Sequence, residues 1–217
     1  MTQSRSDNAV TAAILAGGLA RRLHGTDKSA LIFGGQRTID RQLTALRAVT
    51  DSIIIVGRDD RRGESAGVRA VPDLVSGAGA LGGIYSALAQ SGYPRTLIVA
   101  CDMPFLNVAV LERLVRPASP SIDVVMPRTD DGLQPLCAVY ATRLADTVRR
   151  RIDRGLLKVA DLAEDVQIEE IGPEELAGYD PDGLMFVNVN TPHDYERAKG
   201  LLDLEGDRIT NVQQRPS

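Results

Sequence analysis

Apolar and polar positions alternate along the chain in two ways, and together they predict an α/β fold. Short continuous apolar runs rich in β-branched residues are typical of strands buried on both faces of a sheet. Residues 53–56, which are Ile-Ile-Ile-Val, form the clearest of these runs. Elsewhere apolar residues recur at helical spacing, as at Ile39, Leu43 and Leu46, which predicts a helix with one buried face.

The strand pattern and the helix pattern alternate through most of the sequence. This order predicts a three-layer, mostly parallel, Rossmann-like sheet with helices on both faces. We expect a single domain over residues 9–203, with 1–8 and 204–217 as flexible tails. Strands are expected at 12–16, 53–56, 68–71, 96–101, 122–126, 136–140, 166–171 and 184–189, and helices around 39–49, 81–88, 111–115, 144–152 and 195–202.

Polar residues and glycines mark where the predicted helices begin and end. Asn107 and Thr142 precede apolar helical patterns and are expected to be N-caps. Thr191 followed by Pro192 indicates another helix start, because proline suits the first helical position. Gly155 is expected to end the helix that precedes it.

The composition is that of an ordinary globular protein. Of the 217 residues, 43% are hydrophobic and 25% are charged, and the formal net charge is −4. A chain of this length supports one domain with a large core. No block of Lys and Arg indicates a nucleic-acid partner, and no apolar run approaches the roughly 18 residues that span a membrane. Cys101 and Cys137 lie in apolar segments without a C-x-x-C motif, so we expect buried thiols and a cytoplasmic protein.

A glycine-rich loop follows the first predicted strand, at the sheet edge where α/β proteins bind ligands. Gly17 and Gly18 let backbone N–H groups approach phosphate oxygens closely, because neither carries a Cβ. Arg22 and Lys28, further along the same loop, can neutralise a triphosphate. The loop lacks the Walker A spacing, and a tight turn with solvated basic residues is the alternative interpretation.

The same loop resembles that of the nucleotidyltransferases of the molybdenum-cofactor pathway, most closely the molybdenum cofactor guanylyltransferases. That family opens with a strand, the sequence L-A-G-G, an arginine-rich stretch and a D-K pair. All of these are present here in register, as Leu15-Ala16-Gly17-Gly18, Arg21-Arg22 and Asp27-Lys28. His24 falls where the family usually has glycine.

The resemblance spans residues 10–202 and implies a fold and an activity. The implied fold is nucleotide-diphospho-sugar transferase-like. The implied activity is transfer of GMP from GTP to the phosphate of molybdopterin, or of its molybdenum form, with release of pyrophosphate. Mg²⁺ is the implied cofactor, with Mn²⁺ as the alternative. Molybdenum-insertion proteins and target molybdoenzymes are the candidate protein partners.

A second glycine-rich segment matches the dinucleotide-binding pattern G-x-G-x-x-G. It runs from Gly77 to Gly82, and Asp102 follows twenty residues later at the end of a predicted strand. An NAD-dependent oxidoreductase is therefore the main alternative from another enzyme class. Against it, the opening strand has its own glycine loop, and no hydride-transfer constellation follows. Met103-Pro104 also turns the chain away directly after Asp102.

The resemblance gives this second segment a different role. The family has an Asp and then G-P-L-x-G before a helix. Here these are Asp73 and Gly79-Ala80-Leu81-Gly82-Gly83, with Ala80 in place of proline. The resemblance implies that Gly79, Leu81 and Gly82 line the base and ribose pocket. Asp73 is then expected to accept hydrogen bonds from guanine N–H groups, since a carboxylate has acceptors only; a turn residue after Pro72 is the alternative.

A carboxylate, Asp102, emerges from the apolar run 97–101. A lone carboxylate in such a place is costly unless it is paired or holds a cation. Mg²⁺ prefers one or two carboxylates together with phosphate oxygens and water. These demands favour a metal ligand, with a helix cap or a turn as the alternative. The family carries C-D-x-P here, which matches Cys101–Pro104, and its Asp binds the metal.

Two later segments resemble the acceptor half of the family. Gln134 stands where the family usually has an acidic residue before P-L, and 186–192 matches F-x-N-x-N-T-P. Asn188 and Asn190 alternate with valines, so we expect both amides on one face of a strand. The resemblance implies that this region holds molybdopterin, with Asn190 as a candidate to complete the metal shell. The helix start at 192 is expected to bind an anion, or else Asn190 simply ends the strand.

The expected reaction is an in-line attack by the acceptor phosphate on the α-phosphorus of GTP. Because the nucleophile is already an anion, no general base is required, and catalysis is positioning and charge neutralisation. Asp102 is expected to place Mg²⁺. The phosphates are expected to be held by Gly17, Gly18, Arg22 and Lys28.

Alternatives stay open at the level of sequence. The sister cytidylyltransferases use CTP and tend to carry L-A-A-G, so Gly17 favours guanine. Sugar-nucleotide and phospholipid-precursor transferases share the opening loop but lack the N-V-N-T-P of 188–192. A protein that binds GTP without transfer is the non-enzyme alternative. Arg128 and Lys158 are candidate acceptor-phosphate contacts on charge alone, with a solvated face as the alternative.

Overall fold

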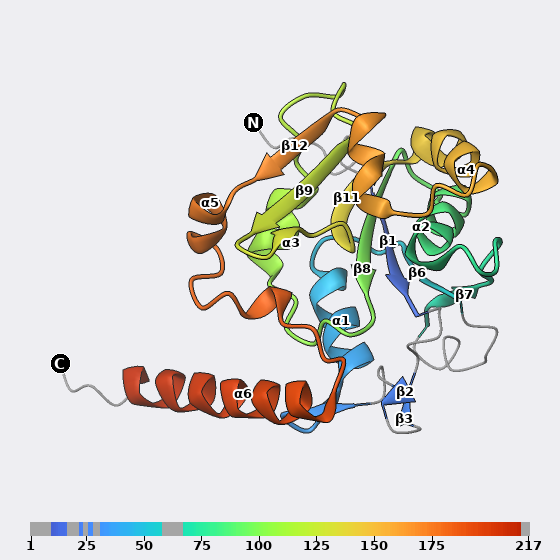
Figure 1. Cartoon of the computed structure of the whole chain (residues 1–217). Coiled ribbons are helices and arrows are strands. Elements are labelled where there is room, and N and C mark those ends of the chain that lie inside the picture. Colours follow the sequence, from blue (N-terminus) through green and yellow to red (C-terminus); the bar gives the residue numbers. More distant parts are fainter. Residues whose placement is uncertain (1–9, 17–21, 24–25, 28–30, 58–66, 214–217) are drawn as a thin grey trace.

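The described part of the chain folds around one mixed sheet with helices on both faces (Figure 1). The computed structural model describes residues 10–16, 22–23, 26–27, 31–57 and 67–213, and the side chains of 10–16, 31–57 and 67–202. Within these ranges the sheet has eight strands. Seven follow the order β10-β9-β11-β8-β1-β6-β7, and β12 pairs with β9 beside this path.

Four parallel strands form one half of the sheet. β1 (Val10–Leu15) lies between β6 (Ile53–Val56) and β8 (Arg95–Ala100), and β7 (Arg69–Val71) lies at the edge beside β6. β1 and β6 are buried along their whole length, as their apolar runs predict. The strand expected at 53–56 is confirmed residue for residue.

The other half of the sheet contains the antiparallel pairs. β11 (Cys137–Ala141) runs antiparallel to both β8 and β9 (Val124–Thr129), and β10 (Gly132–Leu133) forms a hairpin with β9. β12 (Ile168–Ile171) pairs with β9 in parallel. The predicted mostly parallel sheet is confirmed, with β10 and β11 as its antiparallel members.

Successive residues of each strand point into two different cores. Ile14 and Val99 point into the first core, and Leu15 and Ile98 into the second. The expected three-layer arrangement is therefore confirmed. The first core is covered by α1 (Thr38–Arg47), α3 (Val108–Leu114) and α5 (Pro173–Ala177), and the second by α2 (Gly79–Ala89) and α4 (Ala145–Asp153).

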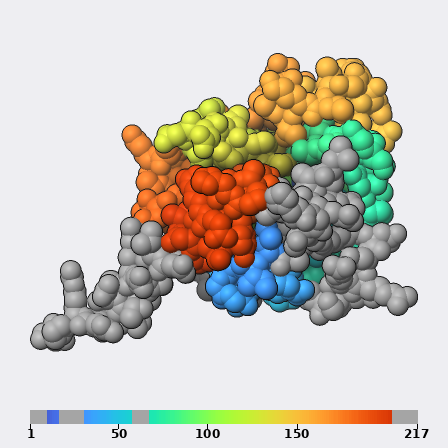
Figure 2. Space-filling model, turned by 60° about the horizontal axis from the view of Figure 1, so that its bottom comes forward, coloured from blue at the N-terminus to red at the C-terminus, as the bar shows by residue number. Residues whose placement is uncertain are grey.

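A small third cluster joins α6 (Pro192–Gln213) to the short strand β4 (Ile32–Phe33). The ring of Phe33 lies edge-on to that of Phe105, with centroids 5.6 Å apart, and 5.1 Å from the ring of Tyr195. Figure 2 shows this end of the molecule, where the red segment leading into α6 lies between the yellow-green and blue segments. No helix in the described ranges is long and apolar enough to cross a bilayer.

Two short hairpins were not predicted from the sequence. β2 (Arg22–Leu23) pairs with β3 (Thr26–Asp27), so that the backbone of Arg22 lies opposite Asp27. β4 pairs with β5 (Gln36–Arg37) around a two-glycine turn. Strands of two residues carry too little alternation to be recognised from a pattern.

The strand expected at 184–189 is not formed. Residues Leu184–Phe186 form a 3₁₀ turn, and irregular backbone follows up to α6. Gly183 precedes the turn with a φ of +63°, a conformation that favours glycine. The backbone N–H of Met185 donates to the Asp180 carboxylate at 2.9 Å. These local contacts turn the chain although the alternating valines resemble a strand.

Two helix ends differ from the prediction, and one start is confirmed. Thr142 opens a 3₁₀ turn and does not cap a helix, because its hydroxyl donates to the Tyr93 carbonyl at 2.6 Å. α6 continues to Gln213, past the expected domain end at 203, and the domain boundaries stay a prediction. Asn107 caps α3 as expected, since its Oδ1 accepts from the Ala109 N–H at 2.9 Å.

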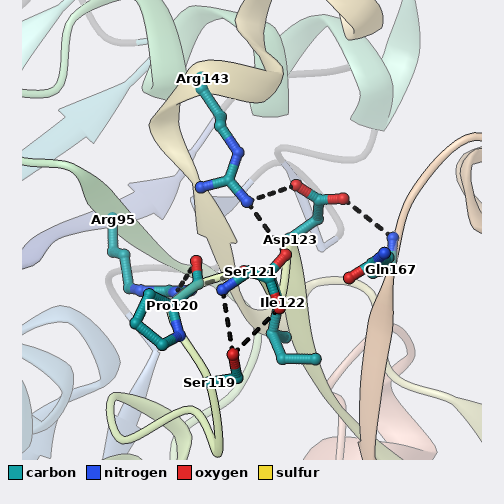
Figure 3. A network of polar contacts seen from close by, with 8 residues as sticks. All are labelled: Arg95, Ser119, Pro120, Ser121, Ile122, Asp123, Arg143 and Gln167. Carbon is teal, nitrogen blue, oxygen red and sulfur yellow. Dashed lines mark hydrogen bonds and ion pairs between the residues drawn. The ribbon is translucent and has the colours of Figure 1, made fainter.

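A network of hydrogen bonds and an ion pair lies at the end of the sheet where the parallel strands begin (Figure 3). The Asp123 carboxylate accepts from Arg143 Nη2 at 2.8 Å and from the backbone N–H of Gln167 at 2.9 Å. Arg95 Nη2 donates to the Ile122 carbonyl at 3.2 Å. The network joins the starts of β8, β9 and β12 to the end of β11.

The two cysteines lie in and beside the sheet, and neither forms a disulfide. Cys137 in β11 is buried, and burial raises the pKa of its thiol to about 12. Cys101, directly after β8, is half-buried. The expectation of two buried thiols is thus confirmed for Cys137 and met in part for Cys101.

Candidate active site

A cavity of about 280 Å³ opens at the carboxyl end of β8. Its lining brings together Asp102, Asn188 and Asn190, which the sequence patterns assigned to the metal and the acceptor. Gln134 joins them from the loop before β11. The remaining walls are formed by Ala100, Met103, Pro135, Leu136 and Cys137.

Strand pairing at the end of β8 places Asp102 at this cavity. The N–H of Ala100, the last residue of the strand, donates to the Leu136 carbonyl at 2.9 Å. Two residues later, the carbonyl of Asp102 accepts from the Val189 N–H at 3.0 Å. The segment that carries both asparagines is therefore bonded directly to Asp102, two residues beyond the end of the strand.

Asn188 and Asn190 reach the cavity without belonging to a strand. Both are exposed, whereas Val189 between them is 1% exposed and packs in the third cluster. Burial of Val189 and its bond to Asp102 leave the two flanking residues beside the cavity. Both asparagines therefore line the same cavity, but the strand on whose face they were expected is not formed.

The start of α6 is capped by its own residues. Thr191 Oγ1 accepts from the Asp194 N–H at 3.1 Å, which confirms Thr191 as the cap. Asp194 Oδ2 accepts from the N–H groups of Thr191 at 2.7 Å and Asn190 at 3.0 Å. Hydrogen bonds from Thr191, the side chain first, and from Asn190 lower the pKa of the Asp194 carboxyl. The carboxylate takes the N–H groups of the two residues before the helix, and the Asp194 N–H goes to Thr191, so anion binding at this helix start stays a prediction.

Asp73 lies in the turn that leads from β7 into α2. Its Oδ1 accepts from the Val75 N–H at 3.2 Å and from the Ser86 hydroxyl at 3.0 Å. The same hydroxyl accepts from the Leu74 N–H at 2.8 Å. The turn interpretation is therefore correct for Asp73, while its recognition of guanine stays a prediction.

Backbone geometry explains the glycines of the G-x-G-x-x-G segment. Gly77 and Gly79 have φ values of +86° and +59°, where residues with a Cβ are strained. A Cβ on Gly82 would lie 2.8 Å from the Val75 carbonyl oxygen. The segment follows the edge strand β7 rather than the central β1. It therefore lacks the position of a dinucleotide-binding loop, and the oxidoreductase alternative is not supported.

The loop predicted to bind phosphates lies mostly outside the described residues. Leu15 and Ala16, which open it, are buried at the end of β1, and the Ala16 N–H donates to the Val56 carbonyl at 2.9 Å. β1 ends at the same edge of the sheet as β8, because the two strands are parallel. The predicted residues Gly17, Gly18 and Lys28 lie outside the described residues, as does the side chain of Arg22.

The oxygen donors at the cavity fit Mg²⁺. Asp102 supplies a carboxylate, and Asn188 and Asn190 supply amide oxygens, all of them hard ligands. Across the described ranges, no three His, Cys, Asp or Glu side chains gather at one point. A closed site made of protein ligands, as for structural zinc, is therefore not formed there. The donor set fits a metal whose remaining ligands are substrate phosphates and water.

A larger cavity of about 570 Å³ adjoins the first and shares Asn188 with it. This cavity was not predicted from the sequence, because its lining comes from several separate segments. Carboxylates are frequent in it, and burial raises the pKa of the Asp180 carboxyl above its ordinary range. The lining residues are 129–131, Pro173, Leu176, Ala177, 180–183, 186–188, Asp194 and Arg197.

Two cations considered for the acceptor phosphate lie elsewhere. Arg128 pairs with Glu170 at 2.6 Å, and Lys158 pairs with Asp161 at 3.3 Å. Both cations are exposed, and neither lines the cavity at Asp102. The solvated-face interpretation is correct for both.

Two polar residues of α1 support the turn that contains Asp102, and neither was predicted from the sequence. Gln42 Nε2 donates to the Ala100 carbonyl at 2.7 Å, and Arg41 Nε donates to the Pro104 carbonyl at 3.1 Å. The signal was present, since Gln42 lies three residues after Ile39, on the apolar face of the predicted helix. A polar residue on such a face needs a partner inside the fold.

Comparison with known proteins shows which family the chain belongs to. The sequence profile of the MobA-like NTP transferase domain matches residues 12–167. The molybdenum cofactor guanylyltransferase of Desulfosudis oleivorans is 34% identical over 90% of this chain and 96% of its own length. The probable molybdenum cofactor guanylyltransferase of Pelotomaculum thermopropionicum is 36% identical over 89% of this chain and 93% of its own.

A solved structure agrees with the sequence relatives. Molybdopterin-guanine dinucleotide biosynthesis protein A from Archaeoglobus fulgidus superposes with a TM-score of 0.75 at 29% identity. The superposition covers 89% of this chain and 99% of that one. The domain profile covers more than half of the chain, and the relatives match over nearly their full lengths. The chain therefore belongs to the MobA-like NTP transferase family, as the resemblance of its loops predicted.

Proposed function

We propose that this protein transfers GMP from GTP to the terminal phosphate of molybdopterin, or of its molybdenum form, and releases pyrophosphate. The observation that carries the proposal is the meeting of Asp102, Asn188 and Asn190 at one cavity beyond β8. The relative named molybdenum cofactor guanylyltransferase, at 34% identity over nearly its whole length, supports the choice of substrates.

The reaction is an in-line displacement at phosphorus. An anionic oxygen of the acceptor phosphate attacks the α-phosphorus of GTP and forms the new P–O bond. The bond from the α-phosphorus to the oxygen that bridges to the β-phosphorus breaks, and pyrophosphate leaves with that electron pair. No proton has to be removed from the nucleophile, so no general base is required. The protein contributes positioning and charge neutralisation.

The triphosphate is assigned to the loop after β1. Gly17 and Gly18 bring backbone N–H groups close to the phosphate oxygens. Arg22 offers a fork of donors, and Lys28 a point charge. The parallel pairing of β1 and β8 supports this assignment, because it brings the start of the loop to the sheet edge where Asp102 lies.

The guanine base is assigned to the turn before α2. Asp73 accepts from the N1–H and N2–H groups of guanine, which no other standard base presents in the same pair. Among the described residues, hydrogen bonds to Asp73 reach only Oδ1, so Oδ2 keeps its capacity to accept. Beside this carboxylate, the start of α2 offers Gly79, Leu81 and Gly82 to the base and ribose.

Asp102, with an amide oxygen from Asn188 or Asn190, is assigned to hold Mg²⁺, with Mn²⁺ as the alternative. When bound, the ion neutralises charge on the reacting phosphates and fixes their relative position. We assign the acceptor to the side of Asn188, where the 570 Å³ cavity adjoins the smaller one.

The biological setting belongs to the same proposal. The thiols of Cys101 and Cys137, which form no disulfide, favour a cytoplasmic location. A product that is itself a cofactor has to reach other proteins. Molybdenum-insertion proteins and target molybdoenzymes are therefore the partners that we propose.

The experiment that tests the proposal measures pyrophosphate release with each of the four nucleoside triphosphates. Each reaction contains Mg²⁺ and is run with and without molybdopterin. Release only with GTP and acceptor is the expected result. A preference for CTP would keep the mechanism and change the base. Tight GTP binding without release under any condition would leave a binding protein and overturn the catalytic roles.

A further inference from the structure

We infer that Gln42 of α1 is a positioning residue for Asp102. It fixes the turn from which this carboxylate meets the substrate phosphates and their metal. The inference rests on the proposed function, because that proposal assigns Asp102 to the reacting groups. It adds a residue that touches neither substrate and acts through the backbone of 100–103.

The contacts of Gln42 place its side chain under both ends of this turn. The side chain is fully buried at 0% exposure. Its Nε2 donates to the carbonyl of Ala100 at 2.7 Å and to the carbonyl of Met103 at 3.0 Å. Ala100 is the last residue of β8, and Met103 follows Asp102 directly. One nitrogen atom thus ties the backbone before and after the carboxylate.

The chemistry of the two contacts requires an amide. Backbone carbonyls only accept hydrogen bonds, so the atom between them must be the NH₂ group, and both of its hydrogens are used. Methionine has nearly the same length and no donor. Glutamate has the same shape with two acceptors. Asparagine keeps the amide but is one methylene shorter.

The other end of the same amide shows that packing alone does not explain Gln42. Its Oε1 is buried and has no hydrogen-bond partner among the described residues. A buried acceptor without a partner opposes folding. Ile39, Leu43 and Leu46 fill the same face of α1 with apolar groups. The two carbonyl contacts are therefore the feature that accounts for a glutamine here.

Neighbouring contacts hold the rest of the turn, so that Gln42 completes a fixed frame. Arg41 Nε donates to the Pro104 carbonyl at 3.1 Å, and its guanidinium lies 5.7 Å from the centre of the Phe105 ring. On the other side, the Val189 N–H donates to the Asp102 carbonyl at 3.0 Å. Without Gln42, the carbonyls on both sides of Asp102 lose this donor, and fewer hydrogen bonds hold the backbone between them.

The test compares Gln42→Met with the full wild-type chain. We expect kcat to fall and the half-saturating Mg²⁺ concentration to rise, each by about 10- to 100-fold, as for other residues that orient a metal ligand. The KM for GTP should stay within about twofold, because the nucleotide contacts proposed above lie elsewhere. Amide hydrogen exchange at 101–104 should speed up, and Mn²⁺ affinity, read by electron paramagnetic resonance without turnover, should fall.

The matched control is Thr38→Val on the same helix. Thr38 is 1% exposed, and its hydroxyl donates to the Leu31 carbonyl at 3.2 Å, away from the turn. This variant also loses a buried hydrogen bond, but it should keep the wild-type metal response. If Gln42→Met does not fold, Gln42→Asn keeps a shorter amide and allows the same comparison.

The outcomes separate this inference from the proposed function. Wild-type turnover, with Gln42→Met and Thr38→Val alike in kcat, Mn²⁺ affinity and exchange at 101–104, would overturn the role of Gln42 alone. An inactive wild-type chain would overturn the proposed function, while Mn²⁺ affinity and hydrogen exchange would still decide whether Gln42 positions Asp102. Loss of Mn²⁺ affinity and faster exchange in Gln42→Met alone would support it.

Discussion

At the scale of the residue, the carboxylate of Asp102 decides between catalysis and mere binding. It lies at a cavity with Asn188 and Asn190, and the proposed contacts to the base and triphosphate come from other loops. We therefore expect Asp102→Asn to lower kcat by about 100-fold or more, because it removes charge at the reacting phosphates. GTP affinity, measured by calorimetry, should weaken only severalfold.

A control for this change is another acidic residue on the surface. Asp161 pairs with Lys158 at 3.3 Å and does not line the cavity. Asp161→Asn should leave both kcat and GTP affinity near the wild-type values. Turnover retained in Asp102→Asn would remove the role assigned to this carboxylate, whatever the fate of GTP binding.

At the scale of the element, the start of α2 depends on one close backbone approach. A Cβ on Gly82 would lie 2.8 Å from the Val75 carbonyl oxygen and 3.0 Å from the Ala78 Cβ. Neither neighbour is a flexible side chain, so the turn that carries Asp73 has to move. We expect Gly82→Ala to cost about 1–3 kcal/mol of stability. The KM for GTP should rise about tenfold or more if Asp73 recognises the base.

A second glycine in a helix shows what alanine does without a clash. A Cβ on Gly200 of α6 would meet no neighbouring atom within 4 Å. Gly200→Ala should stabilise the protein by roughly 0.5–1 kcal/mol, because alanine favours the helix, and should not change GTP affinity. Chemical denaturation, nucleotide titration and steady-state kinetics of both variants give the comparison. An unchanged KM in Gly82→Ala would count against a base pocket in this turn.

The elements also show what a sequence can predict and what it cannot. The strand at 53–56 was predicted correctly because a continuous β-branched run has few other uses. The prediction of a strand at 184–189 was wrong, because Gly183 and the hydrogen bond from the Met185 N–H to Asp180 turn the chain. The alternation of apolar and polar residues carries no information about such contacts.

The candidate site was predictable in part for a related reason. Asp102, Asn188 and Asn190 were predicted from family motifs, and each motif lies within one short segment of the sequence. That they meet at one cavity depends on the hydrogen bond from Val189 to Asp102, which joins segments far apart in the sequence. Gln42 was not predicted, because the helix was identified from its apolar positions alone. The larger cavity was not predicted, because no single segment forms it.

At the scale of the whole molecule, the two ends of the sheet have separate tasks. Asp102 follows β8, whereas Arg95 and the Asp123–Arg143 pair lie where the strand begins (Figure 3). The strand has six residues, which is about 20 Å of extended chain. Changes that far apart and without shared partners usually add in their effect on stability. The polar network should therefore support the fold without tuning the reaction.

This separation predicts the behaviour of Asp123→Ala. The change removes the acceptor for Arg143 and for the Gln167 N–H, so we expect a loss of about 1–2 kcal/mol, limited by the exposure of Arg143. As a control, Glu112→Ala breaks an exposed pair with Arg116 at the end of α3 and should cost less than about 0.5 kcal/mol. kcat and the KM for GTP should stay within about twofold of wild type in both variants. The effects of Asp123→Ala and Asp102→Asn on stability should add in the double variant. A shifted KM for GTP in Asp123→Ala, or a coupling energy between the two changes, would show that strain passes along β8 from one end of the sheet to the other.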